Sequence, residues 1–378
     1  MKFKDELFSP YIFLIGFIIF FVIGIVGRFY FLEYFSSKIS IYTLLYLLLI
    51  SLSFIVGQKI KLNIQENLLI ASIVFLITLF TFKRYSYFSI LFSILGLLIL
   101  YLLKKNIFIR YYIPIFIIGI SICLINIIII GKIPLINPSI RESSLTPLFV
   151  LGYTFLLISN NIGLIKEKYP KNIIFPVFSI LLFTSYGFRT YIILLIISTM
   201  ATLYLIGNKK KIIYFGIIGS ILIIILGYLT ILFLPQNWKL NPLELLLYRV
   251  TFTFDVFDKI CTNVGIKIIG NYSLLTETTT GYTISEKILN YSHNITSTIF
   301  GPPIFDGGIP EVLIFTLFVS ISLFNLYGKA RKNRIYIPYY SLIISIFIVS
   351  IEISPYPLII LLIPSSLYIS KLNLVHND

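Results

Sequence analysis

Three arginines, Arg141, Arg189 and Arg249, are the side chains of this sequence best suited to chemistry on a phosphate. A planar guanidinium binds two phosphate oxygens at once and keeps its charge at neutral pH. Converging arginines would therefore suit a pyrophosphate, whose leaving charge they would stabilise. The simpler alternatives are an interfacial anchor for Arg189, a polar loop residue for Arg141, and for Arg249 a local ion pair with Asp255 or Asp258.

His293 is the first candidate for a general base, because an imidazole exchanges a proton near neutral pH. A surface histidine without a catalytic role is the competing interpretation, and four carboxylates are alternative bases: Glu277, Glu286, Asp306 and Glu311. The sequence contains no metal-binding motif and no glycine-rich phosphate loop, and Cys123 and Cys261 show no metal-ligand spacing. We therefore expect neither a metal nor another cofactor.

The composition shows where these side chains must be held. Of 378 residues, 58% are hydrophobic and only 12% charged, and the mean hydropathy is +0.98. A soluble domain is about a quarter charged, so a water-soluble enzyme and a disordered chain are both excluded. Apolar segments long enough to suggest membrane helices occupy residues 10–32, 39–57, 67–82, 86–103, 111–131, 145–165, 172–186, 188–207, 212–234, 308–328, 335–351 and 355–370.

The predicted fold is thus an all-α polytopic membrane protein with about 12 transmembrane helices, in one integral membrane domain over residues 1–378. The stretch 172–207 is too long for one helix, and Gly187 marks its return turn. The pair at 335–370 contains Glu352, Pro355 and Pro357 and could instead form one broken re-entrant element. Residues 235–307 form the only long polar stretch, with an amphipathic helix over Leu243–Ile260.

Charge sets the expected orientation. The sequence has 30 Lys and Arg against 15 Asp and Glu, a net charge of +15. With the N-terminus inside, 18 of the basic residues fall in inner segments and 7 in short outer loops, among them Arg28, Arg141 and Arg189. Basic residues concentrate in cytoplasmic loops, so we expect a cytoplasmic-membrane protein with both termini cytoplasmic. The long loop 235–307 is then extracytoplasmic, and the basic clusters indicate topology and anionic-lipid contacts rather than nucleic-acid binding.

Several motifs resemble one known family. These are an outer loop from Gly131-Lys132-Ile133-Pro134 to Arg141, the mouth Gly187-Phe188-Arg189-Thr190, and the run from His293 to Asp306-Gly307-Gly308. With about twelve spans and one late long loop, the sequence resembles the oligosaccharide repeat unit polymerases, or O-antigen polymerase-like proteins. Arg141 is followed by Gly152 at a spacing that also occurs in bacterial members. Arg189 departs from that spacing, since Met200 stands in the corresponding place.

The resemblance implies a membrane glycosyltransferase of the GT-C type that joins oligosaccharide units carried on polyprenyl pyrophosphate or phosphate at the outer face. It implies catalytic roles for Arg141, Arg189 and His293, and substrate binding by Arg249, Glu277 and Asp306. Its partners would be the lipid-linked oligosaccharide, membrane lipids and a chain-length regulator.

Three alternatives to a polymerase stay open at this point. A ligase of the same superfamily would transfer finished glycan to another acceptor. A transporter or flippase would place polar residues at the membrane midplane. Glu352 is the main candidate for such a midplane residue, unless it lies in an outer turn. A structural scaffold would make no chemical use of the outer arginines.

Overall fold

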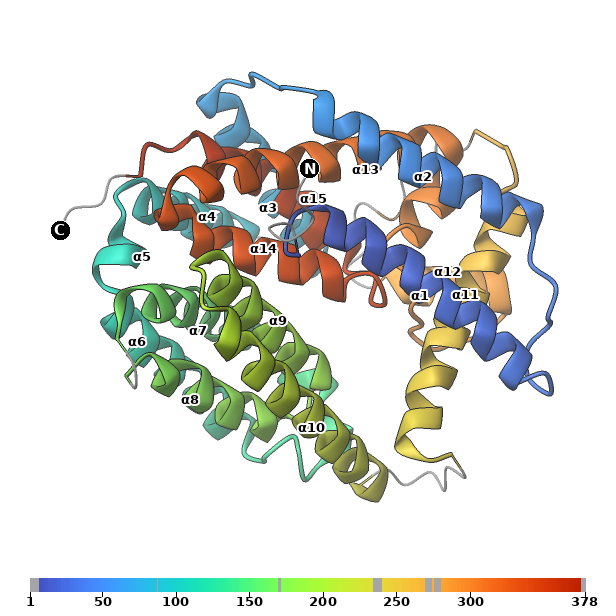
Figure 1. The fold of residues 1–378 in the computed structure, drawn as a ribbon, viewed down its shortest axis with the longest axis horizontal. Coiled ribbons are helices and arrows are strands. Elements are labelled where there is room, and N and C mark those ends of the chain that lie inside the picture. Colours follow the sequence, from blue (N-terminus) through green and yellow to red (C-terminus); the bar gives the residue numbers. More distant parts are fainter. Residues whose placement is uncertain are drawn as a thin grey trace. The chain divides into compact units, whose positions relative to one another are not determined.

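The computed structural model describes residues 7–86, 88–168, 171–233, 240–268, 274 and 280–374. These residues are overwhelmingly helical, and the β pairing among them is an isolated bridge between Ile268 and Gly308. Five of the described helices are long and apolar enough to cross a membrane, and seven shorter apolar helices accompany them. The structure therefore confirms the all-α class and fits a polytopic membrane protein (Figure 1).

The chain divides into two compact units. Unit 1 comprises Met1–Tyr101, Leu245–Lys329 and Phe347–Leu372, and unit 2 comprises Leu102–Glu244, Ala330–Ile346 and Asn373–Asp378. Both units are built from segments that are distant in the sequence. The prediction of a single membrane domain over 1–378 stays a prediction.

Unit 1 contains most of the helices from the two ends of the chain. Its elements are α1 (Tyr11–Tyr30), α2 (Ile41–Lys59), α3 (Glu66–Tyr85), α4 (Phe88–Lys104), α11 (Pro242–Val264), α12 (Thr280–Leu289), α13 (Gly301–Lys332) and α15 (Tyr356–Lys371). Helix α1 approaches α11 closely because two glycines of α1, Gly24 and Gly27, lie at the contact between the helices. A Cβ on Gly24 would lie 2.6 Å from Cβ of Phe254, and one on Gly27 would lie 1.8 Å from Oγ1 of Thr251.

Unit 2 is centred on one helix. Its elements are α5 (Ile107–Arg110), α6 (Tyr112–Ile130), the short 3-10 helices Pro138–Ile140, Glu142–Ser144 and Arg334–Tyr336, α7 (Pro147–Lys166), α8 (Lys171–Tyr186), α9 (Arg189–Leu205), α10 (Lys209–Phe233) and most of α14 (Ile337–Val349). Helix α7 packs against α6, α8 and α9 (Figure 1). In the 18-residue apolar stretch of α7, 67% of the residues are buried inside the protein, whereas the corresponding share for α6 is 22%. Helix α7 therefore forms the core of this unit.

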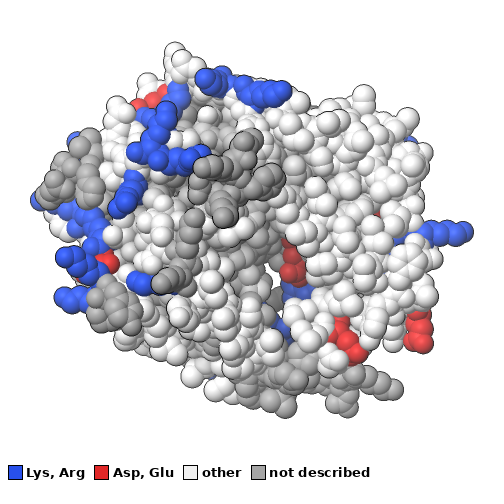
Figure 2. All heavy atoms as spheres, in the orientation of Figure 1, with Lys and Arg blue, Asp and Glu red and all other residues white. Residues whose placement is uncertain are grey.

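Many helices expose aliphatic side chains, as a lipid-facing surface requires. In α1 the aromatic residues Phe13, Phe17 and Phe21 are buried, whereas Ile19 and Val26 are 52% and 56% exposed. Figure 2 shows broad areas of one face without a charged side chain. Because hydrocarbon does not penalise exposed aliphatic groups, such side chains can face lipid.

Every one of the twelve predicted apolar ranges is occupied by a helix, although not all of these helices are long enough to be counted as spans. The predicted return turn is present: α8 ends at Tyr186, α9 begins at Arg189, and Gly187 adopts φ 71°. Residues 337–371 form two helices, α14 and α15, and Glu352 lies in the turn between them. The segment 235–307 is more structured than a loop, because it contains α11, α12 and the start of α13.

The predicted orientation can be tested by cysteine labelling, since Cys123 and Cys261 are both buried and should not react. In intact cells, a membrane-impermeant maleimide should label a Lys132→Cys variant, because Lys132 is exposed in the predicted outer loop. A Lys59→Cys variant should be labelled only after the membrane is permeabilised, since the exposed Lys59 lies on the predicted cytoplasmic side. The opposite pattern would contradict the orientation.

Candidate functional site

Arg141 is held by its own loop in unit 2. Its Nε donates to the carbonyl oxygen of Pro134 at 3.2 Å, and its Nη2 donates to that of Leu135 at 3.1 Å. The loop is fixed in turn, because the backbone N–H of Leu135 donates to the carbonyl oxygen of Ser185 at 2.9 Å. Burial lowers the pKa of the half-buried guanidinium, but an arginine remains charged at neutral pH.

The turn between α8 and α9 lies against this guanidinium. A Cβ on Gly187 would be 3.0 Å from Nε of Arg141 and 3.1 Å from Cα of Leu135. Together with its positive φ, this contact explains why glycine is required at position 187. Arg189 begins α9 two residues later and is half-buried. The structure therefore brings Arg141 against the turn that leads into Arg189.

A buried network of hydrogen bonds connects the Arg141 loop with α6 and α8. Nδ2 of Asn126, near the end of α6, donates to the carbonyl oxygen of Ser144 and to the hydroxyl of Tyr186, each at 3.1 Å. Oδ1 of Asn126 accepts a hydrogen bond of 2.5 Å from Thr146, whose Oγ1 also caps α7. Tyr186 donates to the carbonyl oxygen of Cys123 at 2.7 Å. These bonds fasten the end of the Arg141 loop, at Ser144 and Thr146, to α6 and join α6 to α8.

Aromatic rings complete this support at the start of α9. The ring of Tyr191 lies 4.7 Å from that of Tyr153, 5.0 Å from Phe149 and 5.5 Å from Phe188. The hydroxyl of Tyr153 also donates to the carbonyl oxygen of Tyr191 at 2.9 Å. These edge-to-face contacts pack the first turn of α9 against α7.

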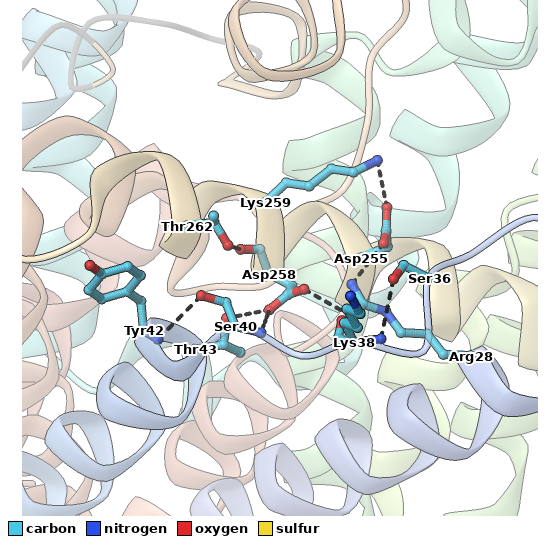
Figure 3. A network of polar contacts seen from close by, with 10 residues as sticks. All are labelled: Arg28, Ser36, Lys38, Ser40, Tyr42, Thr43, Asp255, Asp258, Lys259 and Thr262. Carbon is cyan, nitrogen blue, oxygen red and sulfur yellow. Dashed lines mark hydrogen bonds and ion pairs between the residues drawn. The ribbon is translucent and has the colours of Figure 1, made fainter.

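In unit 1, Arg28 forms a buried ion-pair network (Figure 3). Its Nη2 lies 2.7 Å from Oδ1 of Asp255, and its Nη1 lies 2.9 Å from Oδ2 of Asp258. The side chain of Arg28 is only 2% exposed. Lys259 makes a further pair with Asp255 at 2.9 Å, so two cations face two carboxylates.

The same network reaches the segment between α1 and α2. Arg28 donates to the carbonyl oxygen of Lys38 at 2.8 Å, while Asp258 accepts from the backbone N–H of Ser40 at 3.0 Å and from the hydroxyl of Thr43 at 2.5 Å. The guanidinium also lies 4.7 Å from the centre of the Phe254 ring. The assembly joins α1, α2 and α11, and its charges compensate one another, which indicates a structural role.

Arg249 does not pair with Asp255 or Asp258, which the sequence offered as its local partners. Those carboxylates are taken by Arg28, and Arg249 instead forms an ion pair with Glu352 in the turn between α14 and α15. Arg249 is 51% and Glu352 33% exposed. Glu352 was the acidic residue that most suggested a transporter. In the structure it is the ion-pair partner of an arginine and lies in a turn between helices.

The segment around Ser354 connects several elements of unit 1. Its hydroxyl donates to the carbonyl oxygen of Thr298 at 2.7 Å and accepts from the backbone N–H of Ser297 at 3.0 Å. Two residues later, the hydroxyl of Tyr356 donates to Glu311, just past the kink of α13 at Gly308. The other carboxylate oxygen of Glu311 is buried and has no hydrogen-bond partner.

The remaining candidates lie in or near these elements. His293 is exposed, and its ring lies 4.8 Å from that of Tyr291 in an edge-on arrangement. Asp306 is fully buried, and its Oδ2 accepts a hydrogen bond of 2.9 Å from the backbone N–H of Leu274. Glu277 lies outside the described residues. Within the described part of the chain, no three His, Cys, Asp or Glu side chains gather in a way that could hold a metal ion.

Comparison with known proteins identifies the family. The family model described as "Putative O-antigen polymerase" matches residues 6–363, nearly the whole chain. The chain belongs to this family. It is 28% identical over 355 residues to the uncharacterized protein MJ0420 of Methanocaldococcus jannaschii, covering 88% of this chain and 86% of that protein. It is 27% identical over 268 residues to the uncharacterized protein MJ0419 of the same organism, covering 66% and 73%. No solved structure matches.

Within this O-antigen polymerase family member, the sequence left several supporting residues unrecognised. The charge pattern assigns Arg28 to an outer loop, whereas in the structure it lies buried in the last turn of α1. Asn126 stood unnoticed within an apolar span, where an isolated amide is itself a signal of internal hydrogen bonding. Gly152 serves close packing of α7 on α6, because a Cβ there would lie 2.7 Å from Sγ of Cys123.

Replacing Arg28 should destabilise unit 1 strongly, because Arg28→Gln leaves Asp258 without its ion-pair partner in a buried site. Breaking a buried pair costs about 3–5 kcal/mol. Lys259→Gln is the matched control, since its side chain is 49% exposed and such a pair contributes only about 0–1 kcal/mol. The measurement is thermal unfolding of the detergent-solubilised protein. Equal stability of the two variants would show that the Arg28 network is not structural.

Proposed function

We propose that this member of the O-antigen polymerase family is a glycosyltransferase. It joins oligosaccharide repeat units carried on polyprenyl pyrophosphate or phosphate, and it works at the outer face of the cytoplasmic membrane. The observation that carries the proposal is the immobilised Arg141 beside the turn that leads into Arg189. Family membership and the apolar helices support a membrane-embedded reaction on a lipid-linked substrate.

In the proposed reaction, a hydroxyl oxygen of the acceptor unit attacks the anomeric carbon of the growing glycan. The bond between that carbon and the phosphate oxygen breaks, and its electron pair leaves with the lipid pyrophosphate. Arg141 and Arg189 stabilise this developing negative charge. Because neutral carbonyl oxygens hold Arg141, its positive charge is not cancelled by its own supports. Fixed charge of this kind is usually worth more than charge that must reorient.

The hydroxyl proton needs an acceptor, and we assign this role to His293. Its exposure lets a saccharide reach the imidazole. Arg249, Glu277 and Asp306 are proposed to bind the substrate, Arg249 through the polar turn that it forms with Glu352. Energy for the transfer comes from the bond to the lipid phosphate, so the proposal requires no nucleotide.

Substituting the two arginines tests the assignment directly. Arg141→Ala and Arg189→Ala should each lower the rate of chain growth by about 10²–10³, the usual cost of losing one oxyanion-stabilising group. Lys132→Ala is the control, because Lys132 is an exposed cation in the same loop. The assay supplies purified protein in liposomes with a synthetic lipid-linked repeat unit and measures product length. Normal product lengths in both arginine variants would exclude their catalytic role.

The same assay separates the proposed polymerase from its alternatives. A polymerase lengthens the glycan when the lipid-linked unit is both donor and acceptor. A ligase would form product only after a different acceptor is added. A flippase would move the labelled lipid across the bilayer without forming a glycosidic bond.

Gly187 offers a second test, of the placement of Arg141 rather than its charge. Gly187→Ala and Gly131→Ala introduce the same methyl at similar backbone angles, φ 71° and 73°. A Cβ at 131 meets nothing within 4 Å, whereas one at 187 meets the Arg141 guanidinium. Both variants carry a backbone strain of about 1–2 kcal/mol, but only Gly187→Ala should shorten the product. Equal product lengths would show that this contact does not position Arg141.

A further inference from the structure

Unit 1 contains an apolar groove between α3, α13 and α15. The groove has a volume of about 450 Å³, and Leu69, Phe315, Phe318, Ile363 and Pro364 are among its lining residues. Leu68 and Ile314 also line it and are 59% and 55% exposed, so the groove opens at the surface of the helices. The Tyr356–Glu311 pair lies at one end.

A second cavity of about 400 Å³ adjoins the other end, because Ile64, Leu69 and Leu367 line both spaces. Its remaining lining is largely polar and consists of Leu62, Asn325, Lys329, Ser370 and Lys371. Two lysines therefore contribute to this mouth, and none of its lining residues that the structure describes is Asp or Glu. Nζ of Lys371 is oriented by a hydrogen bond of 2.9 Å to Oδ1 of Asn63.

The dimensions of the groove correspond to one leaflet of a bilayer. Along α15 the lining runs from Tyr356 to Leu367, which is about 16 Å at 1.5 Å per residue. The hydrocarbon core of a bilayer is about 30 Å thick, so one leaflet is about 15 Å. The lysine mouth lies at the end of α13 and α15 that the charge pattern assigns to the cytoplasmic side, where anionic headgroups concentrate.

We propose that this groove and its lysine mouth bind one anionic phospholipid of the cytoplasmic leaflet. Lys329 and Lys371 contact the phosphate, with the side-chain amide of Asn325 as a hydrogen-bond donor, and one hydrocarbon chain lies along the groove toward Tyr356. Lysine is a point-charge partner for phosphate and tolerates headgroups of different shape. The site is independent of the proposed glycosyl transfer, and its lipid would bridge the mutually packed α3 and α15.

Native mass spectrometry of the purified full-length protein tests the site with phosphatidylglycerol and phosphatidylcholine as probes. The wild type should retain one phosphatidylglycerol and release phosphatidylcholine during delipidation. The double variant Lys329→Gln, Lys371→Gln should bind phosphatidylglycerol about tenfold more weakly, because each lysine near an anionic headgroup contributes to binding. Lys61→Gln is the matched control, since Lys61 is exposed beside Leu62 but does not line the mouth.

A second variant tests the tail independently of the charge. Ser72→Phe would fill the groove from α3 while leaving both lysines in place, and it should also lose the retained phosphatidylglycerol. Equal retention of the two lipids, or unchanged retention in the lysine variant or the Ser72 variant, would overturn the proposal. So would displacement of phosphatidylglycerol by inorganic phosphate alone, or a preference for polyprenyl phosphate over phosphatidylglycerol.

Discussion

The fold of unit 1 depends on burying the guanidinium of Arg28. Moving an ion out of water costs several kcal/mol even after the protein relaxes, so the group is tolerable only when opposite charges and hydrogen bonds surround it. Asp255 and Asp258 supply the charges, and the carbonyl oxygen of Lys38 supplies a further acceptor. All three partners must be in place together. This requirement fixes the register of α11 against α1 and the path of the segment leading into α2.

Small residues make this pairing geometrically possible. The aspartates can reach Arg28 only because Gly24 and Gly27 let α11 approach the backbone of α1. Lipid-exposed helices gain little from burying aliphatic surface against one another, so close backbone approach and internal hydrogen bonds carry more of the packing energy. The contact of Gly152 with Cys123 between α6 and α7 follows the same rule in unit 2.

Local patterns in the sequence predicted the helices well, because length and hydropathy are properties of single segments. The twelve apolar ranges, the turn at Gly187 and the helix over Leu243–Ile260 all depend on such neighbours in the chain. Ion pairing, in contrast, does not depend on neighbours in the chain. Asp255 and Asp258 follow Arg249 within one helix, yet Arg28, more than 220 residues away from either, takes both. No local spacing distinguishes these partners, so the assignment required the tertiary structure.

The environments of the arginines differ in a way that bears on chemistry. Arg28 faces two carboxylates and Arg249 faces one, so the field of each is largely cancelled where it stands. Arg141 is held by the neutral carbonyl oxygens of Pro134 and Leu135, and no carboxylate pairs with it among the described side chains. These two supports are uncharged, so they do not offset the positive charge of its guanidinium.

Holding Arg141 in this way separates the cost of positioning from the binding of substrate. The loop is fastened through Asn126 to α6 and α8, and Gly187 closes against the guanidinium. These contacts exist before any ligand arrives. The conformational entropy cost of fixing the long Arg141 side chain is therefore offset when unit 2 folds, not when substrate binds. A phosphate that approaches this end of the unit meets an oriented charge. That preorganisation, rather than the presence of arginine in an outer loop, makes Arg141 the strongest candidate for stabilising a leaving group.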